Sequence, residues 1–159
     1  MRTRTAPVFV VAGGNHVTVL VDKTETGGMF DVIEVLAQPG GGPPAHRHEF
    51  VEWFHVLEGE LQLSGERGGA IVPTNLVREG ESATVGPWEW HATLNESDRP
   101  VRFVVVGRPG LMTGYFAEAG VAVADERTPP DREPAGPAAL TEIAARYGIR
   151  FWGGAQPSR

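Results

Sequence analysis

The chain of 159 residues is long enough for one domain with a sizeable core and too short for two domains of ordinary size. Its formal net charge of −6 leaves no basic surface that could bind a nucleic-acid backbone or an anionic membrane. Hydrophobic residues make up 41% and charged residues 21%, which excludes collagen-like and wholly disordered chains. The 21 glycines and 13 prolines favour short elements joined by tight turns, so we expect one β-rich domain over residues 1–159.

The N-terminal apolar run "PVFVVAGG" is too short for the usual core of a signal peptide. No apolar run reaches the roughly 20 residues that span a bilayer, so we expect a cytoplasmic protein without a membrane partner. The chain has no cysteine and can form neither a disulfide nor a thiolate metal site. Histidine and carboxylate side chains are therefore the groups that would hold a metal.

Residues 15–108 read as a series of short strands. Apolar runs of period two alternate with clusters of Gly, Pro, Asn and Asp. The runs are "HVTVLVD", "MFDVIEVLA", "EWFHVLEGELQLSG", "SATVG" and "RPVRFVVVGRP", the third forming two strands joined at Glu58 and Gly59. Strands at this spacing predict an all-β sandwich or barrel.

Residues 109–159 form a C-terminal extension of different character. Glycines bound a short predicted helix over 111–118, and the polar, proline-rich segment 122–137 is typical of a connector. A second helix is predicted over 138–147, where Leu140, Ile143, Ala144 and Tyr147 share one face. We expect that face to pack on the β domain or on a partner subunit.

The stretch "AHRHEFVEW" carries the strongest chemical signal. If residues 45–50 are extended, His46 and His48 point to the same side and Glu52 has the same parity. A third imidazole would have to come from elsewhere, and His91 is the candidate because it follows the turn "GPWEW". Such a set suits a first-row divalent ion with open coordination positions. The ordinary alternative is that these are surface histidines.

Other polar and aromatic residues have separate interpretations. His16 and His55 have no second ligand at a suitable spacing, and Glu49 is interpreted as a solvated neighbour. Phe54 shares the parity of Glu52 and is a candidate for the substrate pocket. Trp88 and Trp90 are further candidates, because an aromatic ring beside a site can stack on a planar substrate.

Two motifs in the chain resemble those of the cupin superfamily. The first is matched at Gly40, His46, His48, Glu52 and Gly59 with every spacing met. The second is matched at Gly80, His91 and Asn95. It departs from the cupin pattern at the turn, where Gly86 and Trp88 replace a proline and a glycine.

The resemblance implies a small double-sheet barrel of the jelly-roll type. It also implies that His46, His48, Glu52 and His91 bind an iron, manganese or nickel ion, with zinc as a further candidate. The chain looks similar to single-domain cupins described as quercetin dioxygenase-like. Similar cupins commonly dimerise, so a homodimer is expected.

Three functions are compatible with these residues. The leading hypothesis is a metal-dependent oxygenase for a small hydroxylated or enolic aromatic or polyketide-like molecule, with Glu52 as a ligand that also serves as a base. A redox-neutral isomerase, cyclase or lyase could use the same ligands. A protein that binds a small molecule without converting it is the third hypothesis.

Overall fold

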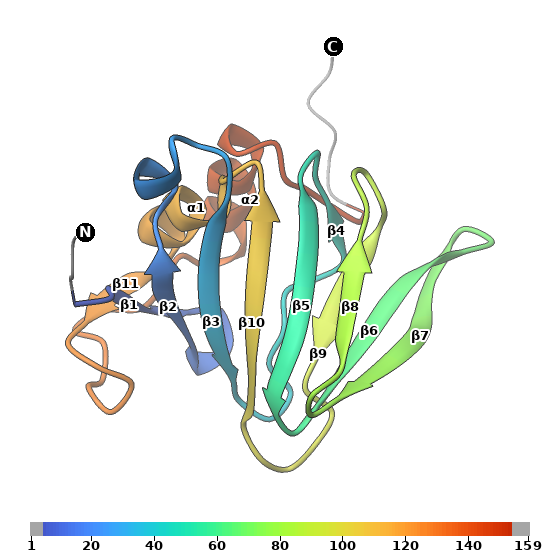
Figure 1. Ribbon diagram of the computed structural model, residues 1–159, viewed down its shortest axis with the longest axis horizontal. Helices are drawn as coiled ribbons and strands as arrows, with labels where there is room; N and C mark the ends of the chain where they lie inside the picture. Colours follow the sequence, from blue (N-terminus) through green and yellow to red (C-terminus); the bar gives the residue numbers. More distant parts are fainter. Residues whose placement is uncertain (1–4, 154–159) are drawn as a thin grey trace.

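The computed structural model describes residues 5–153, which fold into two antiparallel sheets facing each other (Figure 1). The larger sheet has seven strands, in the spatial order β11 (Val121–Val123), β1 (Val8–Val11), β2 (Asn15–Val21), β3 (Asp31–Ala37), β10 (Val101–Arg108), β5 (Val51–Glu58) and β8 (Ser82–Val85). The smaller sheet has five, in the order β12 (Arg150–Phe151), β4 (His46–Arg47), β9 (His91–Leu94), β6 (Glu60–Arg67) and β7 (Ala70–Arg78). The predicted all-β jelly-roll barrel is confirmed.

The core lies between the sheets and follows from the period-two pattern of the strands. Along β10, buried and half-buried residues alternate from Val101 to Gly107, and β3 pairs with it in register from Ala37 to Asp31. The inward side chains of these strands meet those of β2, β5 and β6 in one cluster. Burial of each such side chain contributes about 1.5–3 kcal/mol, so the alternation determines which face of each strand turns inward.

Strand β7 was not predicted from the sequence. It contains Pro73, which cannot donate to a ladder, and six of its nine residues are exposed. The strand lies at the edge of the smaller sheet, and the β6–β7 hairpin projects away from the barrel (Figure 1). The register with β6 shifts by one residue beside this proline, because Leu63 pairs with Asn75 and Ser64 pairs with Pro73, which leaves Thr74 of β7 as the bulged residue.

The C-terminal extension is built into both sheets. Strand β11 pairs with β1, and β12 pairs with β4. The helices α1 (Met112–Ala119) and α2 (Pro137–Arg146) pack against each other behind one end of the larger sheet (Figure 1). Two short 3-10 helices, Ala12–Gly14 and Lys23–Thr26, complete the elements of the described chain. No helix within residues 5–153 has the length and apolar character needed to cross a membrane.

A buried carboxyl group connects α1 to the larger sheet. Asp31, the first residue of β3, is fully buried and accepts a hydrogen bond at 2.9 Å from the backbone N–H of Thr113 in the first turn of α1. Burial raises the pKa of Asp31 to about 6, although hydrogen bonds from Thr113 oppose the shift. Asp31 therefore positions α1, but its burial makes the ionised carboxylate less favourable.

Candidate metal centre

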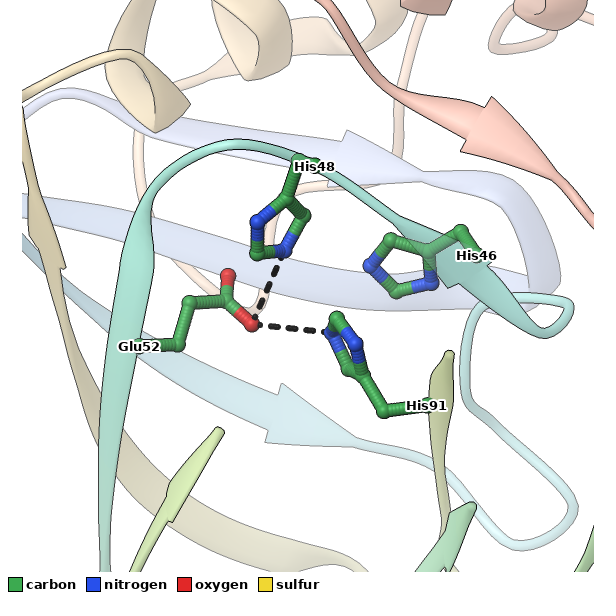
Figure 2. Close-up of side chains that lie close together, drawn as sticks. All are labelled: His46, His48, Glu52 and His91. Atoms are coloured by element: carbon green, nitrogen blue, oxygen red, sulfur yellow. Dashed lines mark hydrogen bonds and ion pairs between the residues drawn. The ribbon is translucent and has the colours of Figure 1, made fainter. Parts of the chain in front are cut away.

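The segment from His46 to Glu52 crosses from one sheet to the other. His46 lies on β4 of the smaller sheet, Glu52 lies on β5 of the larger sheet, and His48 lies in the non-strand crossing between them (Figure 2). Phe50 anchors the crossing, because it is 1% exposed and its ring stacks on that of His48 at 3.5 Å. The expectation of one extended run over 45–50 is therefore wrong. The side chains nevertheless converge, because the two sheets face each other.

His91 reaches the same place from a distant part of the chain. It begins β9 and lies directly opposite His46 of β4 in the register, with 4.3 Å between the ring centroids. The backbone N–H of Trp88 donates to the carbonyl of His48 at 2.6 Å, which joins the turn before β9 to the crossing segment. Strand pairing and this hydrogen bond together bring His91 to the other three side chains.

The four side chains point at one another, as Figure 2 shows. One ligand atom from each of His46, His48, Glu52 and His91 lies within 4.8 Å of the others. Oε2 of Glu52 is 3.1 Å from Nε2 of His91 and 3.4 Å from Nε2 of His48. Two ligands bound at right angles at about 2.1 Å from one ion lie about 3 Å apart, so these separations suit a shared first-row ion.

Backbone carbonyls orient all three imidazole rings. Nδ1 of each ring lies 2.9 or 3.0 Å from a carbonyl oxygen: Pro44 for His46, Phe50 for His48 and Glu89 for His91. A carbonyl can only accept, so Nδ1 carries the proton in each neutral ring and Nε2 keeps a lone pair. Such outer hydrogen bonds are usual for histidines that bind metals.

A buried polar atom without a partner tests whether the cluster fits an ion. Nε2 of His48 has no hydrogen-bond partner, and water does not reach it, because the residue is only 1% exposed. Leaving a buried acceptor unsatisfied costs about 1–3 kcal/mol. A divalent ion bound by this lone pair would remove the penalty, so the donor set fits a metal and suggests a divalent one.

The electrostatic environment keeps His46 neutral and Glu52 ionised, which are the forms of these two side chains that bind metals. Burial, together with the charge of His91, lowers the pKa of His46 to about 3, so this imidazole is neutral. Burial alone would raise the pKa of Glu52, but the nearby imidazoles of His48 and His91 outweigh it and hold this pKa well below its usual range. Burial lowers the pKa of His91 and Glu52 raises it, with a net upward shift. Glu52 is therefore a carboxylate at neutral pH.

The cluster forms one end of a cavity of about 150 Å³ between the sheets. Most of the wall is apolar, and Phe54 contributes to it as expected from its parity with Glu52. The extension forms part of the cavity wall, because α1 contributes Tyr115 and Phe116 and α2 contributes Leu140. These lining residues were not predicted from the sequence. The apolar composition of the two helical segments was their one signal.

A groove of about 730 Å³ lies beside the cavity, between the N-terminal strand and the proline-rich connector. The two hollows share Val11, Ala12, Pro44, Leu140 and Phe151 among their lining residues. The cavity and the groove therefore adjoin at these five residues.

The two tryptophans expected at the pocket do not line this cavity. Trp88 is 48% exposed and occupies a left-handed turn with φ of 63°, which directs its ring to the surface. Trp90 packs outside the barrel, with the Arg47 guanidinium 4.6 Å above its ring and Trp152 in edge contact. The turn that delivers His91 turns both indoles away from the interior.

The remaining polar residues lie apart from the cluster. Glu49 is exposed, and Nδ1 of His55 lies 2.9 Å from the Ser82 hydroxyl on the outer side of β5. His16 is half-buried on β2 beside the groove, and its Nδ1 has no partner. Asn95, the last residue of the second motif, is fully buried and donates to the carbonyls of Ala37 and Arg99, so it braces strand ends.

One known protein family matches part of the chain by sequence. Residues 33–107 match the sequence model of a family described as "Cupin domain". No protein with curated function matches the chain by sequence.

Among solved structures, the polyketide cyclase RemF from Streptomyces resistomycificus is 24% identical with a TM-score of 0.57, over 68% of this chain and 78% of that one. An uncharacterized protein with a double-stranded β-helix domain from Klebsiella pneumoniae is 22% identical with a TM-score of 0.50, over 69% and 83%. Oxalate decarboxylase from Bacillus subtilis is 20% identical with a TM-score of 0.55, over 64% of this chain and 28% of that one. Likeness at this identity shows a shared fold. The chain is therefore similar to a cupin domain over residues 33–107 and shares the fold of these structures.

Proposed function

We propose that this cupin is a metal-dependent enzyme that oxygenates a small hydroxylated or enolic molecule. The observation that carries the proposal is the convergence of His46, His48, Glu52 and His91 at one end of an apolar cavity. A divalent ion such as iron, manganese or nickel, bound by these side chains, would supply Lewis acidity and open positions for substrate and dioxygen. We also propose that the chain belongs with the single-domain cupins described as quercetin dioxygenase-like.

Each residue of the cluster has a defined task in this proposal. The three imidazoles bind through Nε2, since Nδ1 of each is directed at a backbone carbonyl. Glu52 binds through its carboxylate and accepts the proton of a substrate hydroxyl or acidic carbon. Phe54 and the other apolar walls hold the substrate and exclude water. In a dioxygenase reaction both oxygen atoms enter the product, so no external reductant is required.

Oxygen consumption tests the proposal. Metal-free protein is loaded separately with iron, manganese, nickel or zinc and mixed with flavonols, other enols and aromatic diols in an oxygen electrode. We expect uptake that depends on substrate with at least one of the first three metals and none with zinc. The Glu52→Gln variant should lose this uptake. No substrate-dependent uptake with any metal would contradict the oxygenase.

A redox-neutral reaction is the second candidate. A Lewis acid together with Glu52 suffices to form an enolate, from which isomerisation, cyclisation or elimination can follow. RemF is a polyketide cyclase, but at 24% identity this likeness concerns the fold. Turnover that persists without oxygen and with zinc would favour this candidate over the oxygenase. A ligand that binds tightly and is returned unchanged would favour a non-catalytic binder.

We also propose that the chain forms a homodimer. Leu20, Trp53 and Leu57 are large apolar side chains left about 40% exposed. Trp53 and Leu57 lie on the outer side of β5, where a second copy could cover them. Sedimentation equilibrium tests the proposal, and a single species with the mass of one chain would contradict it.

A further inference from the structure

The cavity walls carry information about the substrate that the metal cluster does not. The inference rests on the proposed function, because it specifies the class of molecule that enters the same site. Three properties of the walls decide it, namely volume, charge and the position of the polar groups.

The volume restricts the size of the molecule. The cavity measures about 150 Å³. An engineered protein cavity of about 150 Å³ binds benzene, whereas pockets for drug-sized ligands span roughly 300–1,000 Å³. The space beside the cluster therefore holds about one aromatic ring, and a fused three-ring molecule would have to extend into the adjoining groove or displace α1 or α2.

The walls also restrict the charge of the molecule. Within residues 5–153, no lysine or arginine lines the cavity, and Glu52 is the acidic residue that does. The guanidinium of Arg47 stacks on Trp90 and that of Arg150 lies 6.0 Å from Trp88, so both are directed away from the cluster. An anionic group inside the cavity would have no cationic side chain to compensate its loss of hydration.

The charge balance of the cluster leads to the same conclusion. Three neutral imidazoles, one carboxylate and a divalent ion leave a net charge of +1 by formal addition. One deprotonated oxygen neutralises that charge once its proton has passed by way of Glu52 to solvent, whereas a dicarboxylate or a phosphate dianion would leave an uncompensated negative charge in an apolar space. A molecule that is neutral in water and loses one proton on binding matches the site.

The polar groups lie mainly at the cluster. Asn15 also lines the cavity, but its amide is occupied, because it donates to the carbonyl of Ala12 and accepts from the N–H of Gln38, each at 2.9 Å. Burial raises the pKa of Tyr115 to about 12, so this lining residue stays an uncharged phenol. Apart from Asn15, Thr93 and Tyr115, the lining residues outside the cluster are apolar.

We propose that the substrate is an uncharged molecule no larger than about one aromatic ring, with a hydroxyl or enol oxygen directed at the His46, His48, Glu52 and His91 cluster. Single-ring enols, hydroxyketones and aromatic diols belong to this class. Dicarboxylates, sugar phosphates and multi-ring flavonols do not.

Two binding experiments test the proposal apart from any reaction. In the first, metal-free protein is titrated with phenol by NMR. Val35 lines the cavity from β3, so Val35→Phe fills the space, whereas Val32→Phe makes the same change on the outer side of the strand. We expect Val35→Phe to weaken phenol at least about tenfold and Val32→Phe to leave it unchanged. Unchanged phenol binding in a folded Val35→Phe variant would overturn the assignment of the cavity. If Val35→Phe does not fold, the test is repeated with Val105→Phe, which also fills the cavity.

In the second experiment, zinc-loaded protein is titrated calorimetrically with three probes. Maltol is a neutral single-ring chelator, 3-hydroxyflavone is a larger neutral chelator, and oxalate is a small dianion. We expect maltol to bind at least about tenfold more tightly than either of the others. Tighter binding of oxalate would overturn the charge argument, and equal binding of 3-hydroxyflavone would overturn the size argument. Failure of the oxygenase proposal leaves both experiments readable, because neither requires turnover and the first requires no metal.

Discussion

His46 and His91 lie directly opposite each other on β4 and β9, with 4.3 Å between their ring centroids. Each comes from a different sequence motif, and each ring is held by a backbone carbonyl on its Nδ1 side. The pairing of two short strands is therefore what completes the candidate metal centre. Four predictions follow from this arrangement and from its surroundings.

Removal of either histidine should remove the metal. We expect His46→Ala and His91→Ala to lose stoichiometric metal in elemental analysis. A ligand at about a hundredfold excess over its Kd adds about 2.7 kcal/mol to the stability of the folded state, so Tm should fall by roughly 5–10 °C relative to the loaded protein. His55→Ala is the matched control, because His55 lies outside the cluster beside Ser82. Equal metal content in all variants would refute the assignment of the ligands.

The buried acid Asp31 should make stability depend on pH. Its pKa is about 6 in the folded protein against an ordinary value of 3.8, so the folded state binds the proton more tightly. The contribution of this group is therefore most favourable below about pH 4 and is lost as the pH rises through about 6.

Asp31→Asn keeps an acceptor for Thr113 and removes the ionisation. The variant should exceed the wild type at pH 7.5 by up to about 3 kcal/mol in the free energy of unfolding, and the difference should vanish near pH 4. Urea denaturation at a series of pH values measures it. The prediction is rejected if the free energy of unfolding of the variant, taken relative to wild type, is lower at pH 7.5 than at pH 4.

Replacement of Trp88 by glycine should stabilise the protein. Trp88 has φ of 63°, and among the described residues 5–153 no other non-glycine residue has a positive φ. A side chain there costs about 1–2 kcal/mol. Trp88→Gly should raise Tm by about 2–4 °C and leave the metal content unchanged. Trp90→Gly, which removes the contacts with Arg47 and Trp152, should lower Tm. Similar losses in both variants would contradict the prediction.

Gly42 and Gly40 should differ in their tolerance of a methyl group. A Cβ atom at Gly42 would lie 1.9 Å from the carbonyl oxygen of Thr93, on the strand that carries His91, whereas nothing lies within 4 Å at Gly40. Gly40→Ala therefore meets only the strain of φ of 73°, about 1–2 kcal/mol. Gly42→Ala must displace β9, so it should lose metal affinity as well as stability. Calorimetric metal titration of the two variants separates these effects.

Local chemistry explains which features the sequence could predict. The sequences of β3 and β10 predict which side chains point inward, because successive side chains of a strand lie on opposite faces, and the observed burial alternates in this way. The two motifs identified His46, His48, Glu52 and His91 as a group, and the structure brings them together. Parity along an extended run does not explain the direction of His48, since this residue lies in a crossing between sheets rather than in a strand.

The features that escaped prediction depend on distant partners. Strand β7 contains a proline and few buried side chains, so its pairing with β6 has little local signal. The orientation of Trp88 and Trp90 depends on a turn whose backbone is bonded to His48. Both tryptophans were assigned to the pocket from sequence proximity to His91, and both lie outside it.

The sequence by itself determined the donor atoms and the strands, because residue type and spacing act over a few neighbouring positions. Only the tertiary structure decided that β4 and β9 pair, which sets His46 opposite His91. It also decided that α1 and α2 form part of the wall of a cavity of about 150 Å³, with no lysine or arginine in that wall along the described chain. Volume and charge at the site arise from elements far apart in sequence, so packing rather than any local pattern determines which molecule can enter.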